Sequence, residues 1–168
     1  AILILLMVGA LAGTWMVSGI IPSMIYYGLQ ILSPAVFLPA TLIICSVISI
    51  ATGSSWTTSA TVGIALIGIG GALGFDLGMV AGAVVSGAYF GDKLSPMSDT
   101  TNLAPAMAGT DLFTHIKYMT LTTIPTYIIT LLLFIILGLS VDVTGEANTD
   151  DLLNSITASF NVTPWLFL

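Results

Sequence analysis

The sequence predicts an all-α integral membrane protein, a polytopic bundle with discontinuous or re-entrant helices around polar breaks at residues 52–59 and 92–102. Its composition is the first observation behind this prediction: 6% of the residues are charged, against roughly 25% in a water-soluble domain. The second is charge patterning, because no Asp, Glu, Lys, Arg or His precedes Asp76. An uncharged apolar stretch of that length belongs in a bilayer.

The first apolar run, residues 1–32, is longer than the roughly 20 residues that one membrane span needs. It contains no polar turn, but Gly13-Thr14 and Pro22 interrupt it. We therefore expect a broken helix followed by a second helical piece. The next boundary is expected at Ser33-Pro34, because the residue before a proline disfavours helix.

Two further apolar arms, residues 34–51 and 60–73, flank the polar segment 52–59. Six of the eight residues of this segment carry hydroxyl groups, and none is charged. The segment is either an external turn or a break at membrane depth, where irregular backbone is tolerated only if it is buried in protein or lines a cavity. After the second arm, a stripe of small residues at every fourth position is predicted to pack against a neighbouring helix, namely Gly74, Gly78, Gly82 and Ser86.

The segment 92–102 places ionisable and hydroxyl side chains between two apolar runs, 79–90 and 118–139. Ionisable groups at membrane depth cost about 2.5–3.5 kcal/mol each on insertion scales, so a functional site is expected here. The alternative is a surface loop made of ordinary turn residues. Against that alternative stands the density of small polar residues between Gly and Pro in this segment.

The residue types in both breaks suit a small hard cation, which prefers oxygen ligands. A proline that unwinds a helix frees backbone carbonyls and exposes helix ends to an ion. We expect helix breaks at Gly53, Pro96 and Pro105, and we expect the two polar breaks to face one cavity. The candidate ion-binding and proton-coupling residues are Asp92, Ser98, Asp99, Thr100, Thr101 and Asn102 in the second break, with Ser54, Ser55 and Thr57 in the first.

A buried carboxylate is sufficient for cation/proton exchange. Desolvation disfavours its charged form, so such a group can hold a proton or a sodium ion near neutral pH, but not both. Our leading hypothesis is that Asp92 and Asp99 bind the two ions in alternation, with Lys93 offsetting the charge of the empty site.

Enzymatic and nucleic-acid functions find little support. The chain has one Cys and one His, which form no metal-binding motif, so no metal beyond Na⁺ and no cofactor is expected. Two basic residues are too few to bind nucleic acid. The intramembrane protease motifs Gly-x-Gly-Asp and Gly-x-Ser-Gly are not matched around Asp92 and Ser86. We therefore predict that the protein is not an enzyme.

Residues 91–105, Gly-Asp-Lys-Leu-Ser-Pro-Met-Ser-Asp-Thr-Thr-Asn-Leu-Ala-Pro, together with residues 51–56, resemble the NhaC-type Na⁺/H⁺ antiporters. Residues 110–116 and 13–16 resemble the same family. The resemblance implies a secondary active transporter that exchanges Na⁺ for H⁺ in a plasma membrane. Because the family also contains members that exchange malate for lactate, an Na⁺/H⁺-coupled carboxylate exchanger is the alternative. An ion channel or a structural membrane subunit is a third possibility.

On this interpretation the chain is part of a larger transporter. Residues 1–139 form a partial membrane transport domain, 140–163 an extramembrane acidic loop, and 164–168 the start of a further span. Lys117 borders the last complete span, so the positive-inside rule places that end in the cytoplasm. The expected partners are membrane lipid, Na⁺, H⁺, small carboxylates and the remaining spans of the full-length protein.

Overall fold

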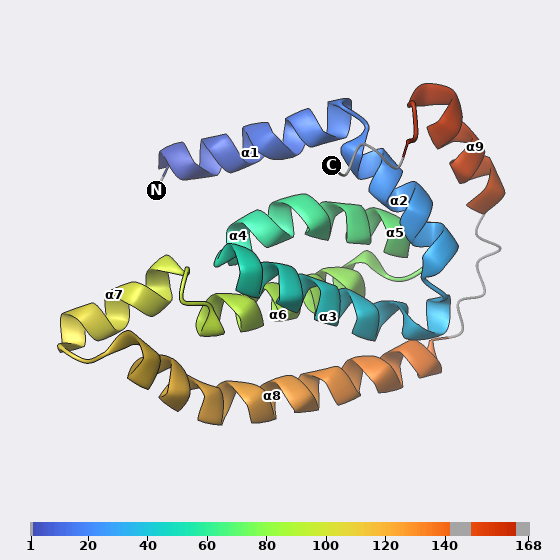
Figure 1. Ribbon diagram of the computed structural model, residues 1–168. Coiled ribbons are helices and arrows are strands. Elements are labelled where there is room, and N and C mark those ends of the chain that lie inside the picture. Colours follow the sequence, from blue (N-terminus) through green and yellow to red (C-terminus); the bar gives the residue numbers. More distant parts are fainter. Residues whose placement is uncertain (1, 142–148, 164–168) are drawn as a thin grey trace.

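The computed structural model describes residues 2–141 and 149–163, and within them it consists of helices joined by short turns, with no strand (Figure 1). The predicted all-α fold class is confirmed. The helices are α1 (Ile2–Val17), α2 (Ile20–Ile31), α3 (Pro34–Thr52), α4 (Ser55–Thr58), the π-helical turn η1 (Ser59–Gly63), α5 (Ile64–Ala72), α6 (Leu77–Leu94), α7 (Asp99–Ala108), α8 (Leu112–Ser140) and α9 (Thr149–Ser159).

The N-terminal run forms a broken helix, as predicted, but the position of the break differs. The axes of α1 and α2 meet at 66° across Ser18 and Gly19. Gly19 has a φ of 87°, a left-handed conformation that glycine adopts at little cost. Gly13-Thr14 lies inside α1, and Pro22 lies in the first turn of α2, where a missing N–H removes no helical hydrogen bond.

Among the described residues, α3 and α8 are each long and apolar enough to cross a membrane, and the bent α1–α2 pair is a third candidate. α8 contains the whole of the predicted span 118–139 and continues through Pro125 without leaving helical conformation. Asp111 caps its start, since Asp111 Oδ2 accepts a hydrogen bond from Thr114 N at 3.0 Å. The helix start predicted at Thr110-Asp111 is confirmed.

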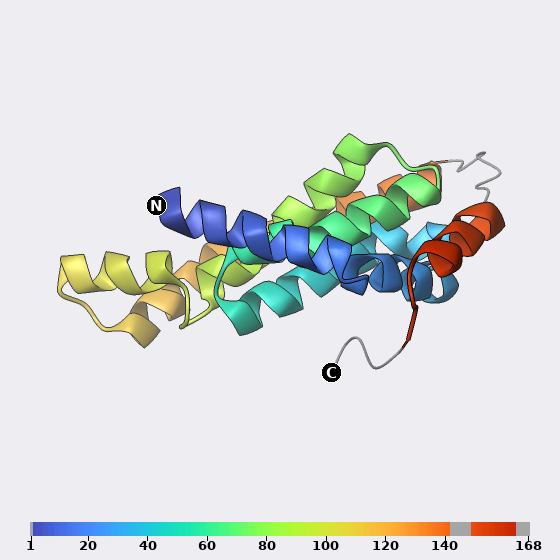
Figure 2. The same ribbon diagram turned by 90° about the horizontal axis from the view of Figure 1, so that it is seen from above.

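The centre of the molecule is the contact between α3 and α6, which run side by side in the same direction (Figures 1 and 2). Two glycines of α6 permit this close approach. A Cβ atom on Gly87 would lie 2.9 Å from Cys45 Cβ, and one on Gly91 would lie 2.5 Å from Ser49 Cβ. The buried apolar cluster around this contact includes Phe37, Leu38, Leu66, Ile69, Val80 and Val84.

The predicted small-residue stripe is on the wrong face of α6. Gly74, Gly78 and Gly82 are exposed, and Gly74 lies before the start of the helix. Gly87 and Gly91 also stand four residues apart, so a spacing of four is present on two faces. Spacing alone could not tell which face meets α3.

Because α3 and α6 run in the same direction, their C-terminal ends lie at the same end of the bundle, where α7 projects (Figures 1 and 2). The two predicted breaks follow these two helices. The parallel packing of α3 and α6 therefore positions the candidate site.

The predicted acidic loop 140–163 contains the helix α9, which packs beside α2. Phe160, just after this helix, contacts Gly19: a Cβ atom on Gly19 would lie 3.3 Å from Phe160 Cδ1. Residues 142–148 of the predicted loop and the predicted start of a span at 164–168 lie outside the described residues.

Candidate functional site

The first break is a tight turn at Gly53 and Ser54, and it is shorter than the predicted segment 52–59 because helix resumes at Ser55. Gly53 has a φ of 71°. A Cβ atom there would lie 2.6 Å from the backbone carbonyl carbon of Met97, so the turn packs directly on the second break. Ser54 Oγ caps α4 by accepting hydrogen bonds from Thr57 N at 3.2 Å and from Thr57 Oγ1 at 3.1 Å.

The second break comprises residues 95–98, between the end of α6 and the start of α7. Ser95 Oγ donates to the Ile50 carbonyl of α3 at 2.7 Å, which ties this break to the end of α3. Asn102 Nδ2 donates to the carbonyls of Pro96 and Ser98, both at 2.7 Å. Pro96 lies in this non-helical segment, so the helix break predicted there is confirmed.

The helix break predicted at Pro105 is wrong. Pro105 is buried inside α7, and the helix continues to Ala108. The Pro105 carbonyl accepts from the N–H of Gly109 and, at 3.0 Å, from that of Thr110. Gly109, with a φ of 69°, therefore ends the helix, because a glycine takes up the left-handed conformation that closes a helix C-terminus.

Asp92, in the last turn of α6, joins the two breaks. Its side chain is 8% exposed. Its Oδ1 accepts a hydrogen bond from Ser98 Oγ at 2.8 Å, and its Oδ2 accepts a longer one from Ser55 Oγ at 3.4 Å. Thr101 Oγ1 donates to the backbone carbonyl of Asp92 at 2.8 Å. The prediction that the two breaks meet is confirmed, with hydroxyls from both of them on one carboxylate.

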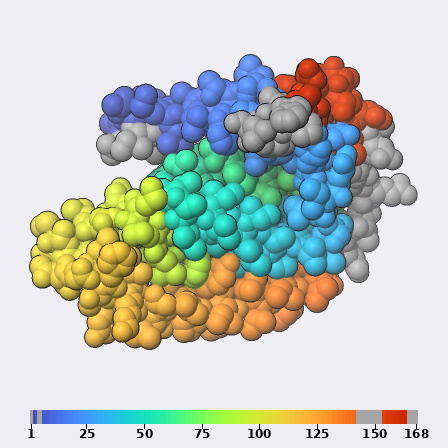
Figure 3. Space-filling model, in the orientation of Figure 1, coloured from blue at the N-terminus to red at the C-terminus, as the bar shows by residue number. Residues whose placement is uncertain are grey.

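A cavity of about 310 Å³ lies beside Asp92, between α1, the first break and the start of α7. In Figure 3, α1 and α7 border an indentation at this end of the molecule. No lysine, arginine or histidine lines it, and its two carboxylates and several hydroxyls are the ligands that a small hard cation prefers. The lining residues are Val8, Thr52, Gly53, Ser54, Trp56, Thr57, Asp92, Met97, Asp99 and Thr100.

The remaining predicted site residues fall into two groups. Asp99 and Thr100 are exposed and line the cavity, and Asp99 Oδ1 accepts from Thr100 N at 2.8 Å. Thr101 and Asn102 do not line it, because both direct their side-chain donors to backbone carbonyls of the break. Their predicted role as ion ligands stays a prediction.

Lys93 is exposed and lines a different cavity, between α6 and α8. The structure does not bring its ammonium group into an ion pair with Asp92. The predicted role in charge compensation therefore has no direct contact behind it.

Sequence reasoning missed several residues that build the site. Val8 contributes to the cavity from α1, and no sequence pattern relates it to the breaks. Ser49 donates to the Ala88 carbonyl and so links α3 to α6 just before both helices end. A buried hydroxyl three residues after Ser46 on an apolar helix was the available signal for Ser49, but it did not reveal the partner helix.

Within the described residues, no group of three or more His, Cys, Asp and Glu side chains is placed to hold a metal ion. Apolar helices that break around a buried carboxylate and its hydroxyl partners define the class of protein: this is a membrane protein with the architecture of ion-coupled transporters, which bind ions at discontinuous helices.

Comparisons with known proteins agree with this class. The family model described as the Na⁺/H⁺ antiporter family matches residues 87–168. The chain is 48% identical to the malate-2H⁺/Na⁺-lactate antiporter of Bacillus subtilis, over 100% of the chain and 36% of that protein. It is 47% identical to the Na⁺/H⁺ antiporter NhaC of Alkalihalophilus pseudofirmus, over 96% of the chain and 35% of that protein.

A third relative, the arginine/ornithine antiporter ArcD of Halobacterium salinarum, is 45% identical over 86% of the chain and 30% of its own length. No solved structure matches. The chain belongs to the Na⁺/H⁺ antiporter family, and it spans about a third of the length of the curated relatives it matches.

Proposed function

We propose that the full-length protein is a secondary active transporter that exchanges Na⁺ for H⁺, with Asp92 as the group that holds either ion. The observation that carries this proposal is the convergence of both breaks on one buried carboxylate, through Ser98 at 2.8 Å and Ser55 at 3.4 Å. The relatives named as Na⁺/H⁺ antiporters support it.

In this mechanism, Na⁺ and H⁺ compete for the same carboxylate. The ionised side chain of Asp92 attracts Na⁺ into the cavity, where hydroxyl oxygens of the first break complete its coordination. Protonation of Asp92 removes the charge that holds the cation, so Na⁺ leaves. Asp99, exposed at the same cavity, supplies a second negative charge along the entry path.

The ends of the two helices reinforce this competition. The C-terminal end of α6, where Asp92 lies, carries a partial negative charge that favours a cation. The N-terminal end of α7 carries a partial positive charge and contacts Asp92 through its cap residue Ser98, which favours the ionised carboxylate. These opposing fields stabilise the ionised carboxylate together with its cation.

The test is internal pH in proteoliposomes of the full-length protein under an imposed Na⁺ gradient. Because removing a buried charge from its partners costs several kcal/mol, we expect Asp92→Asn to slow exchange roughly 100-fold or more. Asp99→Asn, at an exposed carboxylate, should slow it about 10-fold or less, in line with the smaller energy of exposed charges.

Asp76→Asn is the matched control, because Asp76 is an exposed acid that caps α6 through Met79 N at 3.0 Å, outside the cavity. An asparagine also caps a helix, so exchange should stay at the wild-type rate. If Asp92→Asn exchanged as fast as Asp76→Asn, the assignment of Asp92 would be wrong.

A second candidate function is an Na⁺/H⁺-coupled carboxylate exchanger. Two relatives have names that specify carboxylate-bearing substrates, malate with lactate and arginine with ornithine. The cavity that Lys93 lines is the structural observation that favours it. Adding malate or lactate to the same proteoliposomes separates the two functions: pure Na⁺/H⁺ exchange is unchanged by either acid, whereas a coupled exchanger moves protons only when the acid is present.

We propose further that the protein is a multi-pass protein of the plasma membrane and not an enzyme. Its partners are then membrane lipid, the transported ions and the remaining spans of the full-length protein, without cofactor or nucleic acid. The apolar helices α3 and α8 and the antiporter names of the relatives support this placement. Obligatory exchange distinguishes such a carrier from a channel, which would pass current without a counter-ion gradient.

A further inference from the structure

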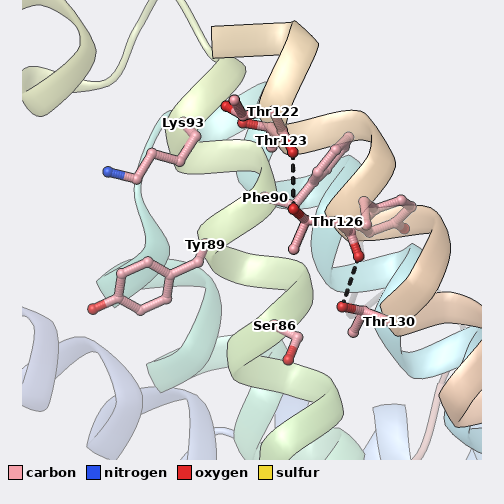
Figure 4. A pocket seen from close by; sticks show the side chains of 9 residues that line it. Ser86, Tyr89, Phe90, Lys93, Thr122, Thr123, Thr126 and Thr130 are labelled. Atoms are coloured by element: carbon pink, nitrogen blue, oxygen red, sulfur yellow. Dashed lines mark hydrogen bonds between the residues drawn. The ribbon is translucent and has the colours of Figure 1, made fainter.

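A second cavity, of about 340 Å³, lies between α6 and α8 (Figure 4). Its volume is in the range of pockets that hold small molecules. Most of its lining side chains carry a hydroxyl group, and Lys93 is its one charged group. None of its lining residues also lines the cavity beside Asp92.

Opposite charges at the end of α6 therefore serve two different cavities. Successive residues of an α-helix point about 100° apart, because one turn takes 3.6 residues. Asp92 consequently faces the breaks, whereas Lys93 lines the cavity beside α8. One turn earlier, Tyr89 projects from the same side of α6 as Lys93 (Figure 4). A cation site and a cationic cavity are thus adjacent along one helix.

The cavity lies well inside the spanning helix α8. Thr122 and Thr130, at its two ends, stand 10 and 18 residues after Leu112, where α8 begins. At a rise of 1.5 Å per residue these positions are roughly 15 and 27 Å along the helix. An ammonium group at such a depth is costly unless it is paired. Lys93 forms no ion pair or hydrogen bond with any described residue, so an anion would supply the missing partner.

The walls of the cavity provide both donors and acceptors. Thr126 Oγ1 donates to the Thr122 carbonyl at 2.8 Å, and Thr130 Oγ1 donates to the Thr126 carbonyl at 2.9 Å (Figure 4). Their protons are therefore used within α8, and their oxygens remain available as acceptors. Lys93 and Tyr89 supply the donors, since the Tyr89 hydroxyl also has no hydrogen-bond partner among the described residues. Phe90 stacks on Tyr127 with ring centroids 4.0 Å apart and closes the cavity with an apolar surface.

We propose that this cavity binds a small carboxylate that also carries a hydroxyl or amino group. The carboxylate pairs with the Lys93 ammonium, and the substituent donates to the threonine oxygens of α8. This proposal deepens the carboxylate-exchange candidate by naming its site, and it is independent of the assignment of Asp92.

The test is equilibrium binding of L-malate and L-lactate to the full-length protein without any ion gradient, so that failure of Na⁺/H⁺ exchange does not affect the result. Lys93→Gln is compared with Lys117→Gln, which removes the other basic residue of the chain, an exposed lysine outside both cavities. Loss of a charge-assisted contact should raise both dissociation constants roughly 10-fold or more in Lys93→Gln. Lys117→Gln should bind like the wild type.

A second variant tests the hydroxyl contact. Thr126→Val keeps the shape of the side chain but removes its oxygen, so the preference for lactate over propionate, which lacks the hydroxyl, should disappear. Absence of acid binding to the wild type, or equal weakening in both lysine variants, would overturn the proposal.

An anionic lipid is the other source of an anion at this position. Binding is therefore measured in phosphatidylcholine vesicles with and without phosphatidylglycerol. We expect the effect of Lys93→Gln on malate binding to be the same in both. If the substitution instead altered only the retention of phosphatidylglycerol, the site would hold a lipid phosphate and the proposal would be wrong.

Discussion

The two breaks differ in what holds them. In the first break the backbone does so: Gly53 adopts a left-handed conformation, and the turn lies against the backbone of Met97. In the second break, extended backbone at Ser95 and Ser98 is held by side chains, with Asn102 bonded to two of its carbonyls. Ser98 also bonds to the Asp92 carboxylate.

This difference separates a fixed part of the site from a part that depends on charge. The geometry of the first break does not change when Asp92 gains or loses a proton, because no charged group holds it. The second break starts α7 from a serine whose proton is given to that carboxylate. Neutralising Asp92 weakens this hydrogen bond, since bonds to charged groups are the stronger ones. We therefore expect the start of α7 to respond to proton and ion binding.

The largest effect should come from Gly53→Ala. The added Cβ would lie 2.6 Å from the Met97 carbonyl carbon in a left-handed backbone, so it is both strained and sterically blocked. We expect the full-length protein to lose about 1–3 kcal/mol of stability, measured as thermal unfolding in detergent, together with most of its exchange activity.

Gly109→Ala is the control for Gly53→Ala. Gly109 has a similar φ of 69°, but no atom lies within 4 Å of an added Cβ. It should show only the strain, and therefore a smaller loss of stability. Equal losses in the two variants would show that contact between the breaks contributes nothing.

An intermediate effect is expected from Ser98→Ala. It removes the donor to Asp92 and the cap of α7 together. Because a hydrogen bond to a charged group contributes about 1.5–3 kcal/mol, we expect the KM for Na⁺ to change roughly 10-fold or more and the pH profile of exchange to shift. Both are measured in proteoliposomes.

Ser54→Ala is matched to Ser98→Ala, because Ser54 also caps a helix, through Thr57 N at 3.2 Å, but has no contact with Asp92. Loss of a cap alone costs about 0.5–2 kcal/mol of stability and leaves the pH profile in place. A shifted pH profile in both variants would contradict the special role of the second break.

The smallest effect should come from Ser55→Ala, which removes the longer hydrogen bond to Asp92 at 3.4 Å. At that distance the bond is weak, and we expect a change of about threefold or less in the KM for Na⁺. A change as large as that of Ser98→Ala would show that the carboxylate is held equally from both breaks.

The sequence alone predicted the membrane class, most helix boundaries and the two polar segments that form the breaks. Pro96 and Asp111 act locally, on the backbone beside them, so their effects were visible without a fold. Pro105 failed because whether a proline breaks a helix depends on its surroundings, and here its buried carbonyl takes part in closing α7. Gly78 and Gly82 failed because a spacing of four residues does not identify the partner helix.

Local chemistry thus determined which residues are able to bind an ion: carboxylates, hydroxyls, and breaks that expose helix ends. Only the tertiary structure decided which carboxylate is central. Asp92 is buried and Asp99 is exposed because α3 and α6 pack in parallel through Gly87 and Gly91 and bring both breaks to one end. The same packing turned Lys93 away from Asp92 to another cavity. Contacts between residues far apart in the chain set these positions, and the spacing of residues within either segment does not contain them.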